Sequence, residues 1–257
     1  MTSDIETPTI DKLADGLYVR QEIDNMVWAD LGGTVVVVDA LEHREKKGDV
    51  FAAIDDTLGG RTVDVVLNTH THYDHVALNN AFASEHGAEI VNQDTRQIDP
   101  DEGLWFRGSD RSCQILPMPD CHTPEDCIVW FPDDSVLCIG DIFGWGLIPL
   151  VMNIRQDSAR HLMATYQRLI DYGARTVVPG HGPVMGTDTL ERYVEYFHWL
   201  LDEVHARVQA GAGDEQIKQE LPPPADIHHW WRFTAWKHAD SLEKIIKSVR
   251  KGWLEPF

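Results

Sequence analysis

The chain has 257 residues, 43% hydrophobic and 25% charged, a globular composition that excludes a disordered or fibrous protein. Its 42 acidic and 22 basic residues give a formal net charge of −20, which repels nucleic acids and anionic membrane surfaces. There is no apolar run of about 18 residues and no basic region followed by an apolar core at the start, so we expect a cytoplasmic protein without nucleic-acid or membrane partners.

Short strands dominate the first quarter of the sequence. They are predicted at 16–20, 25–29, 34–39 and 63–68, and a helix at 44–58 is expected to stop at a pair of glycines. The third strand contains four consecutive valines without alternation, which favours a strand buried on both faces.

Helices become more frequent toward the end of the chain. A helix is predicted at 74–86, and further strands at 89–91, 114–118, 127–131, 135–139 and 176–178. Later helices are predicted at 158–172, 188–209 and 226–251. This pattern fits two sheets with helices on their outer faces. No repeat or linker divides the sequence, so we predict one domain over 1–257, in which 186–257 form a mainly helical extension.

Four cysteines lie close together in the sequence without forming a CxxC pair: Cys113, Cys121, Cys127 and Cys138. Reduced thiols are expected in a chain without a secretory signal, and a disulfide is the alternative.

A dense group of imidazoles and carboxylates follows the predicted strand at 63–68. His70 and His72 are two residues apart and share a face in an extended segment, whereas Asp74 and His75 fall where a helix should begin. The two pairs therefore point at neighbouring but distinct spots. This arrangement suits two metal ions close together better than one.

Three more candidate ligands each follow a strand-like run: His122, Asp141 and His181. With the first motif they give seven nitrogen and oxygen donors, enough for three or four ligands on each of two ions. Imidazole together with carboxylate favours zinc, with iron, manganese and nickel as alternatives.

These motifs resemble the metallo-β-lactamase superfamily over about residues 17–184. The resemblance is carried by Thr69-His70-Thr71-His72-Tyr73-Asp74-His75, His122-Thr123-Pro124, Gly140-Asp141 and Pro179-Gly180-His181-Gly182. It implies a four-layer αββα sandwich of the α/β class, with the site at one edge of the two sheets.

The resemblance also implies roles for individual residues. One metal would be bound by His70, His72 and His122. The second would be bound by Asp74, His75 and His181, with Asp141 bridging the two ions. Asp39, after the valine strand, would support the site without touching the metal.

Departures from related enzymes narrow the expected activity. His72 stands where flavodiiron oxidases have Glu, which disfavours oxygen reduction. The Gly-Cys-Gly-Arg-type stretch that follows the bridging Asp in glyoxalase II enzymes is absent, since 142–146 reads Ile-Phe-Gly-Trp-Gly, so a glutathione thioester is disfavoured. The net charge of −20 disfavours the tRNA-processing members.

The expected function is that of a binuclear metal-dependent hydrolase. A hydroxide bridging two zinc ions would attack a small ester, lactone, thioester, amide or β-lactam. Asp74 and Asp141 are the expected catalytic carboxylates, and Asp74 or a metal-bound water would protonate the leaving group. The alternatives are a mononuclear iron persulfide dioxygenase and a phosphodiesterase or sulfatase of the same superfamily.

Aromatic side chains near the ligands are candidates for binding a small-molecule substrate. Phe143 and Trp145 follow Asp141 in an apolar stretch, 142–152, which reads equally as a pocket wall or as a buried connector. Trp28 is a weaker candidate. His228 to Arg232 are expected to open the last helix, which either closes over the site or packs on the sandwich or on a second subunit, so a homodimer stays open.

Overall fold

The computed structural model describes residues 8–150 and 153–257, and these form two compact units. The first unit contains the residues up to Pro119 together with Glu125–Gly140 and Arg175–Val184. The second contains Asp120–Pro124, Asp141–Ala174 and Met185–Phe257. All strands of the two sheets belong to the first unit, and the long helices after Gly140 belong to the second.

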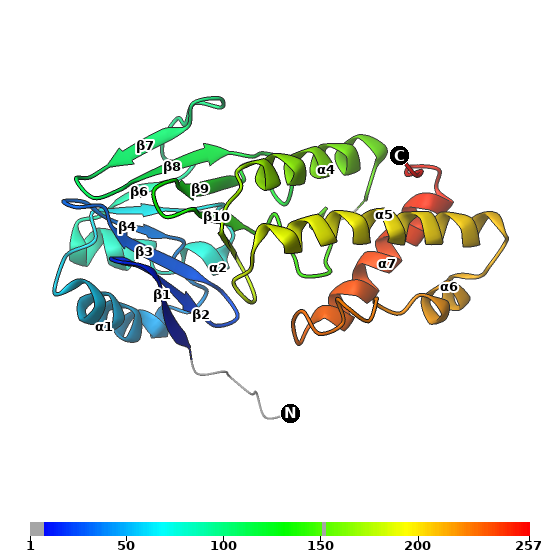
Figure 1. Ribbon diagram of the computed structural model, residues 1–257, viewed down its shortest axis with the longest axis horizontal. Coiled ribbons are helices and arrows are strands. Elements are labelled where there is room, and N and C mark those ends of the chain that lie inside the picture. The colour runs from blue at the N-terminus through cyan, green and yellow to red at the C-terminus, as the bar shows by residue number, and fades with distance from the viewer. Residues whose placement is uncertain (1–7, 151–152) are drawn as a thin grey trace. The chain divides into compact units, whose positions relative to one another are not determined.

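The first sheet of the first unit has six strands in sequential order. Figure 1 labels the blue strands β1 to β4 of this sheet. Neighbours among its first four strands are antiparallel, whereas the last three run parallel to one another. The strands are β1 (Thr9–Ala14), β2 (Leu17–Gln21), β3 (Met26–Asp30), β4 (Val35–Val38), β5 (Val65–Leu67) and β6 (Glu89–Val91).

The second sheet has five strands in the order β11-β10-β9-β8-β7. Only the β10–β11 pair is parallel, and it places the ends of these two strands side by side. The strands are β7 (Leu104–Arg107), β8 (Ser112–Pro117), β9 (Cys127–Phe131), β10 (Val136–Gly140) and β11 (Thr176–Pro179). All four cysteines are free and buried, as expected for reduced thiols.

The run of four valines is buried because β4 has a hydrophobic layer on each face. Val36 and Val38 belong to the cluster between the two sheets, which also contains side chains such as Ile115 and Val129 of the second sheet. Val35 and Val37 face the other way, into a cluster shared with α1 (Lys47–Leu58). The strand therefore lacks alternation because neither face meets water.

The helix predicted at 74–86 is broken into short pieces: α2 (Tyr73–Val76), α3 (Asn79–Ala81) and a π-helical turn, Phe82–His86. The break has a tertiary cause. The backbone N–H groups of Ala77 and Leu78 donate to the carbonyls of Leu41 and Ala40 instead of continuing the helix. Ala40 in turn donates its N–H to the His75 carbonyl, at 2.8 Å, so this exchange fixes the position of His75.

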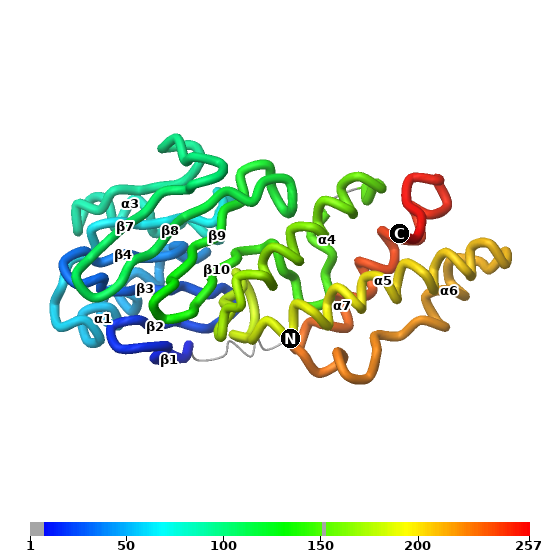
Figure 2. The backbone as a smooth tube through the Cα atoms, turned by 45° about the horizontal axis from the view of Figure 1, so that its top comes forward, coloured from blue at the N-terminus to red at the C-terminus, as the bar shows by residue number. Residues whose placement is uncertain are grey.

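The second unit is helical, and Figure 2 shows its chain as a series of coiled segments. Its elements are α4 (Gln156–Asp171), α5 (Thr187–Gln209), α6 (Asp214–Glu220) and α7 (Thr234–Arg250). The long helix α5 packs against both α4 and α7. The helix α4 starts two residues earlier than predicted, because the Ser158 hydroxyl bonds to both backbone groups of Arg155.

The last helix begins at Thr234, eight residues later than predicted, so the expectation that His228 to Arg232 open it is wrong. These residues form turns instead. The Trp230 N–H donates to the Ile227 carbonyl, and the Thr234 hydroxyl accepts the Trp231 N–H just before the helix starts.

The predicted fold class is confirmed: two mixed sheets pack face to face in an α/β sandwich, and α1 covers the outer face of the first sheet. Within residues 8–150 and 153–257, no helix has both the length and the apolar character that a membrane crossing needs. The first unit alone carries five of the seven predicted ligands, at the strand ends described next.

Candidate metal centre

The segment after β5 is held in place by Asp39. The Thr69 N–H donates to Asp39 Oδ1 at 2.8 Å, and the Thr69 hydroxyl donates to Asp39 Oδ2 at 2.9 Å. Asp39 Oδ2 also lies 3.0 Å from His75 Nδ1. Asp39 is 4% exposed and adopts a φ of 61°, a conformation that Asp tolerates better than most residues. One buried carboxylate thus joins the β4 end to two positions of the histidine motif.

The histidines of the motif gather around one another as the extended segment turns into α2. The ring centroids of His70 and His72 are 4.7 Å apart, and those of His70 and His75 are 4.1 Å apart. His70 and His75 are buried, whereas His72 is exposed. The sequence spacing therefore brings the imidazoles together, as a metal centre requires.

Asp74 lies between two imidazoles of the first unit. Its Oδ2 is 3.2 Å from His181 Nε2 and 3.9 Å from His75 Nε2. The negative charges of Glu42 and Asp74 raise the pKa of the exposed Tyr73 hydroxyl above its usual value. The carboxylates of Glu42 and Asp74 thus place negative charge in this region, which favours the binding of cations.

The His181 loop is fixed by the hairpin between β2 and β3. His181 Nδ1 lies 2.9 Å from the Ile23 carbonyl oxygen. The Asn25 side chain donates to the carbonyls of Pro179, at 2.9 Å, and Gly182, at 2.7 Å. The sequence analysis missed Asn25, because no local pattern connects it to a loop 154 residues away.

His122 and Asp141 both belong to the second unit, and they lie close together. The distance from His122 Nε2 to Asp141 Oδ2 is 3.5 Å. His122 sits in a tight turn that the Asp120 N–H closes on the Thr123 carbonyl at 2.9 Å, and Asp120 has a φ of 64°. Asp141 follows directly on the last residue of β10.

The seven predicted ligands fall into two donor sets, each able to hold a metal ion. One set contains His70, His72 and His122, and the other contains Asp74, His75, Asp141 and His181. Within each set the donor atoms lie within 4.8 Å of one another. Cys121, which precedes His122, is buried and belongs to neither set.

Gly140 at the end of β10 leaves room for Thr69. It has a φ of 50°, and a Cβ added there would lie 2.5 Å from the Thr69 hydroxyl oxygen and 2.7 Å from the Thr69 Cβ. We expect Gly140→Ala to lower the free energy of unfolding by about 2–4 kcal/mol, because Thr69 is bonded to Asp39 and cannot retreat. Urea unfolding of the metal-free protein measures this.

Gly173→Ala is the matched control, because Gly173 has a φ of 61° but open space around its Cβ position. It carries the cost of the backbone conformation alone, about 1 kcal/mol. Equal losses in both variants would show that the contact with Thr69 is unimportant.

The predicted aromatic residues after Asp141 are buried in a cluster of rings. The ring centroid of Trp145 is 5.1 Å from that of Phe143 and 5.7 Å from that of Trp230. The backbone of this stretch is held by two tyrosines, since the hydroxyl of Tyr166 donates to the Ile142 carbonyl and that of Tyr193 to the Leu147 carbonyl. The last two residues of the predicted stretch, 151 and 152, lie outside the described residues.

Trp28, the weaker candidate, is a core residue. It is fully buried in the cluster between the first sheet and α1, and its indole N–H donates to the Thr57 hydroxyl at 2.9 Å. Its side chain is therefore out of reach of a substrate.

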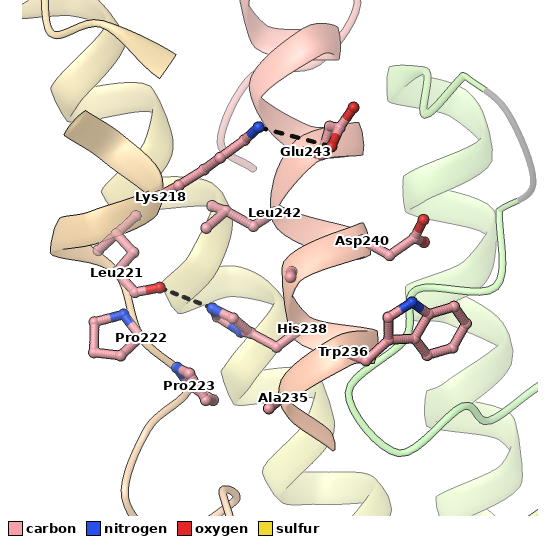
Figure 3. Close-up of a pocket in the computed structure, with 11 residues that line it drawn as sticks. Lys218, Leu221, Pro222, Pro223, Ala235, Trp236, His238, Asp240, Leu242 and Glu243 are labelled. Carbon is pink, nitrogen blue, oxygen red and sulfur yellow. Dashed lines mark hydrogen bonds and ion pairs between the residues drawn. The ribbon is translucent and has the colours of Figure 1, made fainter. Parts of the chain in front are cut away.

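A cavity of about 420 Å³ lies elsewhere in the second unit, between the end of α6 and one side of α7 (Figure 3). Leu221, Pro222, Trp236, His238 and Leu242 are among its lining residues. None of the seven predicted ligands lines this cavity, so it is separate from the candidate metal centre.

Sequence comparison identifies relatives over part of the chain. The model of the metallo-beta-lactamase superfamily matches residues 20–111. A hydroxyacylglutathione hydrolase of Methylococcus capsulatus is 32% identical over 139 residues, which cover 51% of this chain and 52% of that protein. The chain thus spans about half the length of the curated relative that it matches.

Solved structures extend the likeness to most of the chain. A metallo-beta-lactamase family protein from Thermus thermophilus has a TM-score of 0.65 at 17% identity, covering 94% of this chain and 95% of that one. The alkylsulfatase Pisa1 from Pseudomonas sp. has a TM-score of 0.69 at 13% identity, covering 97% of this chain and 51% of that one. A metallo-beta-lactamase from Pontibacter korlensis has a TM-score of 0.61 at 16% identity, covering 74% of this chain and 98% of that one.

At these identities the solved structures report the fold alone. They share the α/β sandwich built here from its two sheets, and the superfamily model covers the segment that contains Asp39 and the histidine motif. The chain is thus similar in sequence to the metallo-beta-lactamase superfamily over residues 20–111, and it shares the fold of the solved members over most of its length.

Proposed function

We propose that this protein is a metal-dependent hydrolase with a binuclear centre. The proposed ligands of the first ion are His70, His72 and His122, and those of the second are Asp74, His75 and His181, with Asp141 shared between the ions. The observation that carries the proposal is the division of these seven side chains into two compact donor sets. Zinc is the proposed metal, because imidazole and carboxylate ligands suit it, with iron, manganese and nickel as alternatives.

The hydrogen bonds of the histidine rings fit metal binding through Nε2. Asp39 lies against Nδ1 of His75, and the Ile23 carbonyl lies against Nδ1 of His181. A proton on Nδ1 leaves the Nε2 lone pair available, and Nε2 of both rings faces Asp74. The donor set therefore suits divalent cations in chemistry as well as in position.

The proposed reaction is hydrolysis of a carbonyl substrate. When bound, the two cations would supply an activated water and would polarise the carbonyl oxygen. Asp74 would take a proton from the attacking water and return it to the leaving group. Asp39 holds His75, and through Thr69 it holds the backbone of the motif, so the ligands need little rearrangement when substrate binds.

A thioester is the substrate class that we propose to test first. The support is the relative from Methylococcus capsulatus, whose name describes hydrolysis of hydroxyacylglutathione. The stretch 142–146, Ile-Phe-Gly-Trp-Gly, differs from the glyoxalase II pattern, so the proposed thiol is one other than glutathione. The buried rings of Phe143 and Trp145 favour an apolar acyl or thiol group.

Metal removal tests the proposal directly. We expect about two zinc ions per chain by elemental analysis, loss of thioester hydrolysis after treatment with a chelator, and its return when zinc is added without oxygen. Hydrolysis that survives complete metal removal would refute the proposal. One iron per chain with oxygen consumption would instead support the persulfide dioxygenase alternative.

A further inference from the structure

Lys237, in the first turn of α7, is a buried lysine without an ion pair. It is 8% exposed, and among residues 8–150 and 153–257 no carboxylate or hydrogen-bond acceptor pairs with its ammonium group. Its Nζ lies 5.0 Å from the ring centroid of Trp231. Lys244 on the same helix is different, because its Nζ is 2.6 Å from an Asp240 oxygen. Burying an ammonium group without an ion pair raises the free energy of the folded protein.

The charges around Lys237 connect it to the candidate metal centre. Burial lowers the pKa of Lys237 below its usual value, while attraction by Asp141 and then by Asp240 opposes this and Lys244 adds to the lowering. Asp141 is one of the proposed ligands, so Lys237 lies within electrostatic reach of a residue of the candidate metal centre.

A second unsatisfied donor lies on the segment that packs against the start of α7. The indole N–H of Trp145 is buried and has no hydrogen-bond partner in the described chain, and Trp145 is 5% exposed. Its φ of 50° is unfavourable for a bulky side chain, and such strain is concentrated at functional sites. The Trp145 ring contacts the Trp230 ring. The next residue in the sequence, Trp231, is the one that contacts Lys237.

The Trp145 segment is held on α7 close to Lys237. The Ser241 hydroxyl donates to the Gly146 carbonyl at 3.1 Å and accepts the Ile148 N–H at 2.7 Å. A Cβ added at Gly146 would lie 3.4 Å from the Thr234 side chain, within the same helical turn as Lys237. The loop that follows Asp141 and the start of α7 are therefore one packed element of the second unit.

We propose that Lys237 and the indole N–H of Trp145 form a subsite for the carboxylate of an aryl- or alkyl-carboxylate substrate. This inference rests on the proposed function for the reaction itself. The rings of Trp230 and Trp231 would pack on the apolar part of such a substrate, and Lys237 would neutralise its charge. With a net charge of −20, the protein as a whole repels anions, so an anionic substrate needs a local cation of this kind.

Binding to the metal-free protein tests the subsite without hydrolysis. The probes are 3-phenylpropionate and its neutral amide, titrated while tryptophan fluorescence is recorded. We expect the wild-type protein to bind the acid about tenfold more tightly than the amide, the usual worth of a charged hydrogen bond. Lys237→Met should abolish that preference, Lys237→Arg should keep part of it, and Trp145→Phe should reduce it about threefold.

Lys247→Met is the matched control, because Lys247 is an exposed lysine on the same helix. It should leave the preference unchanged. Lys237→Met should keep or raise the melting temperature, because it replaces an unpaired buried charge by an apolar side chain of similar length. A preference for the acid that persists in Lys237→Met, or equal binding of both probes by the wild-type protein, would overturn the proposal.

Kinetics of the metal-loaded enzyme give a second readout. The probes are S-phenylacetyl-3-mercaptopropionate and its methyl ester, which differ only in charge. For Lys237→Met we expect KM for the acid to rise about 10–100-fold, with kcat, metal content and turnover of the ester nearly unchanged. If neither probe is hydrolysed, the proposed function fails, whereas the binding experiment still decides on the subsite.

Discussion

His72→Ala is expected to lower kcat/KM at least about 1,000-fold, which corresponds to about 4 kcal/mol of lost transition-state stabilisation. His72 is one of three side chains in the donor set with His70 and His122, so its removal leaves two protein ligands for that ion. Elemental analysis should find about one metal ion per chain instead of two. The imidazole is exposed, so no buried cavity is created and the chain should stay folded.

The control for this variant is His43→Ala, which removes another exposed imidazole of the same unit, outside both donor sets. It should keep full metal content and full activity. Circular dichroism and the melting temperature of the metal-free proteins separate loss of a ligand from loss of structure. Full activity in His72→Ala would show that His72 is not a ligand.

Asp39→Asn is expected to weaken metal binding about 10–100-fold while the fold is kept. The carboxylate now accepts from Thr69 and faces Nδ1 of His75. An amide N–H in that place would donate to Nδ1, and the His75 proton would move to Nε2, where it blocks metal binding. Asn tolerates the φ of 61° at this position, so the backbone should not change.

Competition with a chelator measures the affinity, and urea unfolding of the metal-free protein measures the stability. Asp64→Asn is the control, because its carboxylate accepts the Val35 N–H at 2.7 Å in the same sheet and touches no ligand. It should lower stability to a similar extent without changing metal affinity. Unchanged affinity in Asp39→Asn would show that the tautomer of His75 does not depend on Asp39.

The elements that the sequence predicts well are those with strong local patterns. The valine strand and α1, which ends at Gly59 in a left-handed conformation, are recovered nearly to the residue. The helix at 74–86 is wrong in form because its backbone donors are taken by Leu41 and Ala40, and no local pattern reports such a tertiary contact. The strands β1 and β7 were missed because both are edge strands with exposed positions.

In the candidate site, too, residues with a local sequence pattern could be predicted, whereas residues defined by tertiary contacts could not. The donors could be predicted because imidazoles and carboxylates stand out at the ends of strands, whereas Asp39 was predicted only from the resemblance to the superfamily. Asn25 and Lys237 were not found. Asn25 acts on a loop far away in sequence, and Lys237 resembles any lysine of an amphipathic helix until its burial and missing ion pair are seen.

The contacts of Asn25 can form only late in the synthesis of the chain. Asn25 and the Pro179 carbonyl that it binds are 154 residues apart, so the loop of His181 cannot be fixed until β11 has been synthesised. The histidine motif at 70–75 leaves the ribosome long before that, and closing so long a loop carries an entropic cost. In the proposed metal centre we therefore expect weak cation binding by the incomplete chain, and full loading only after more than two thirds of the polypeptide has emerged.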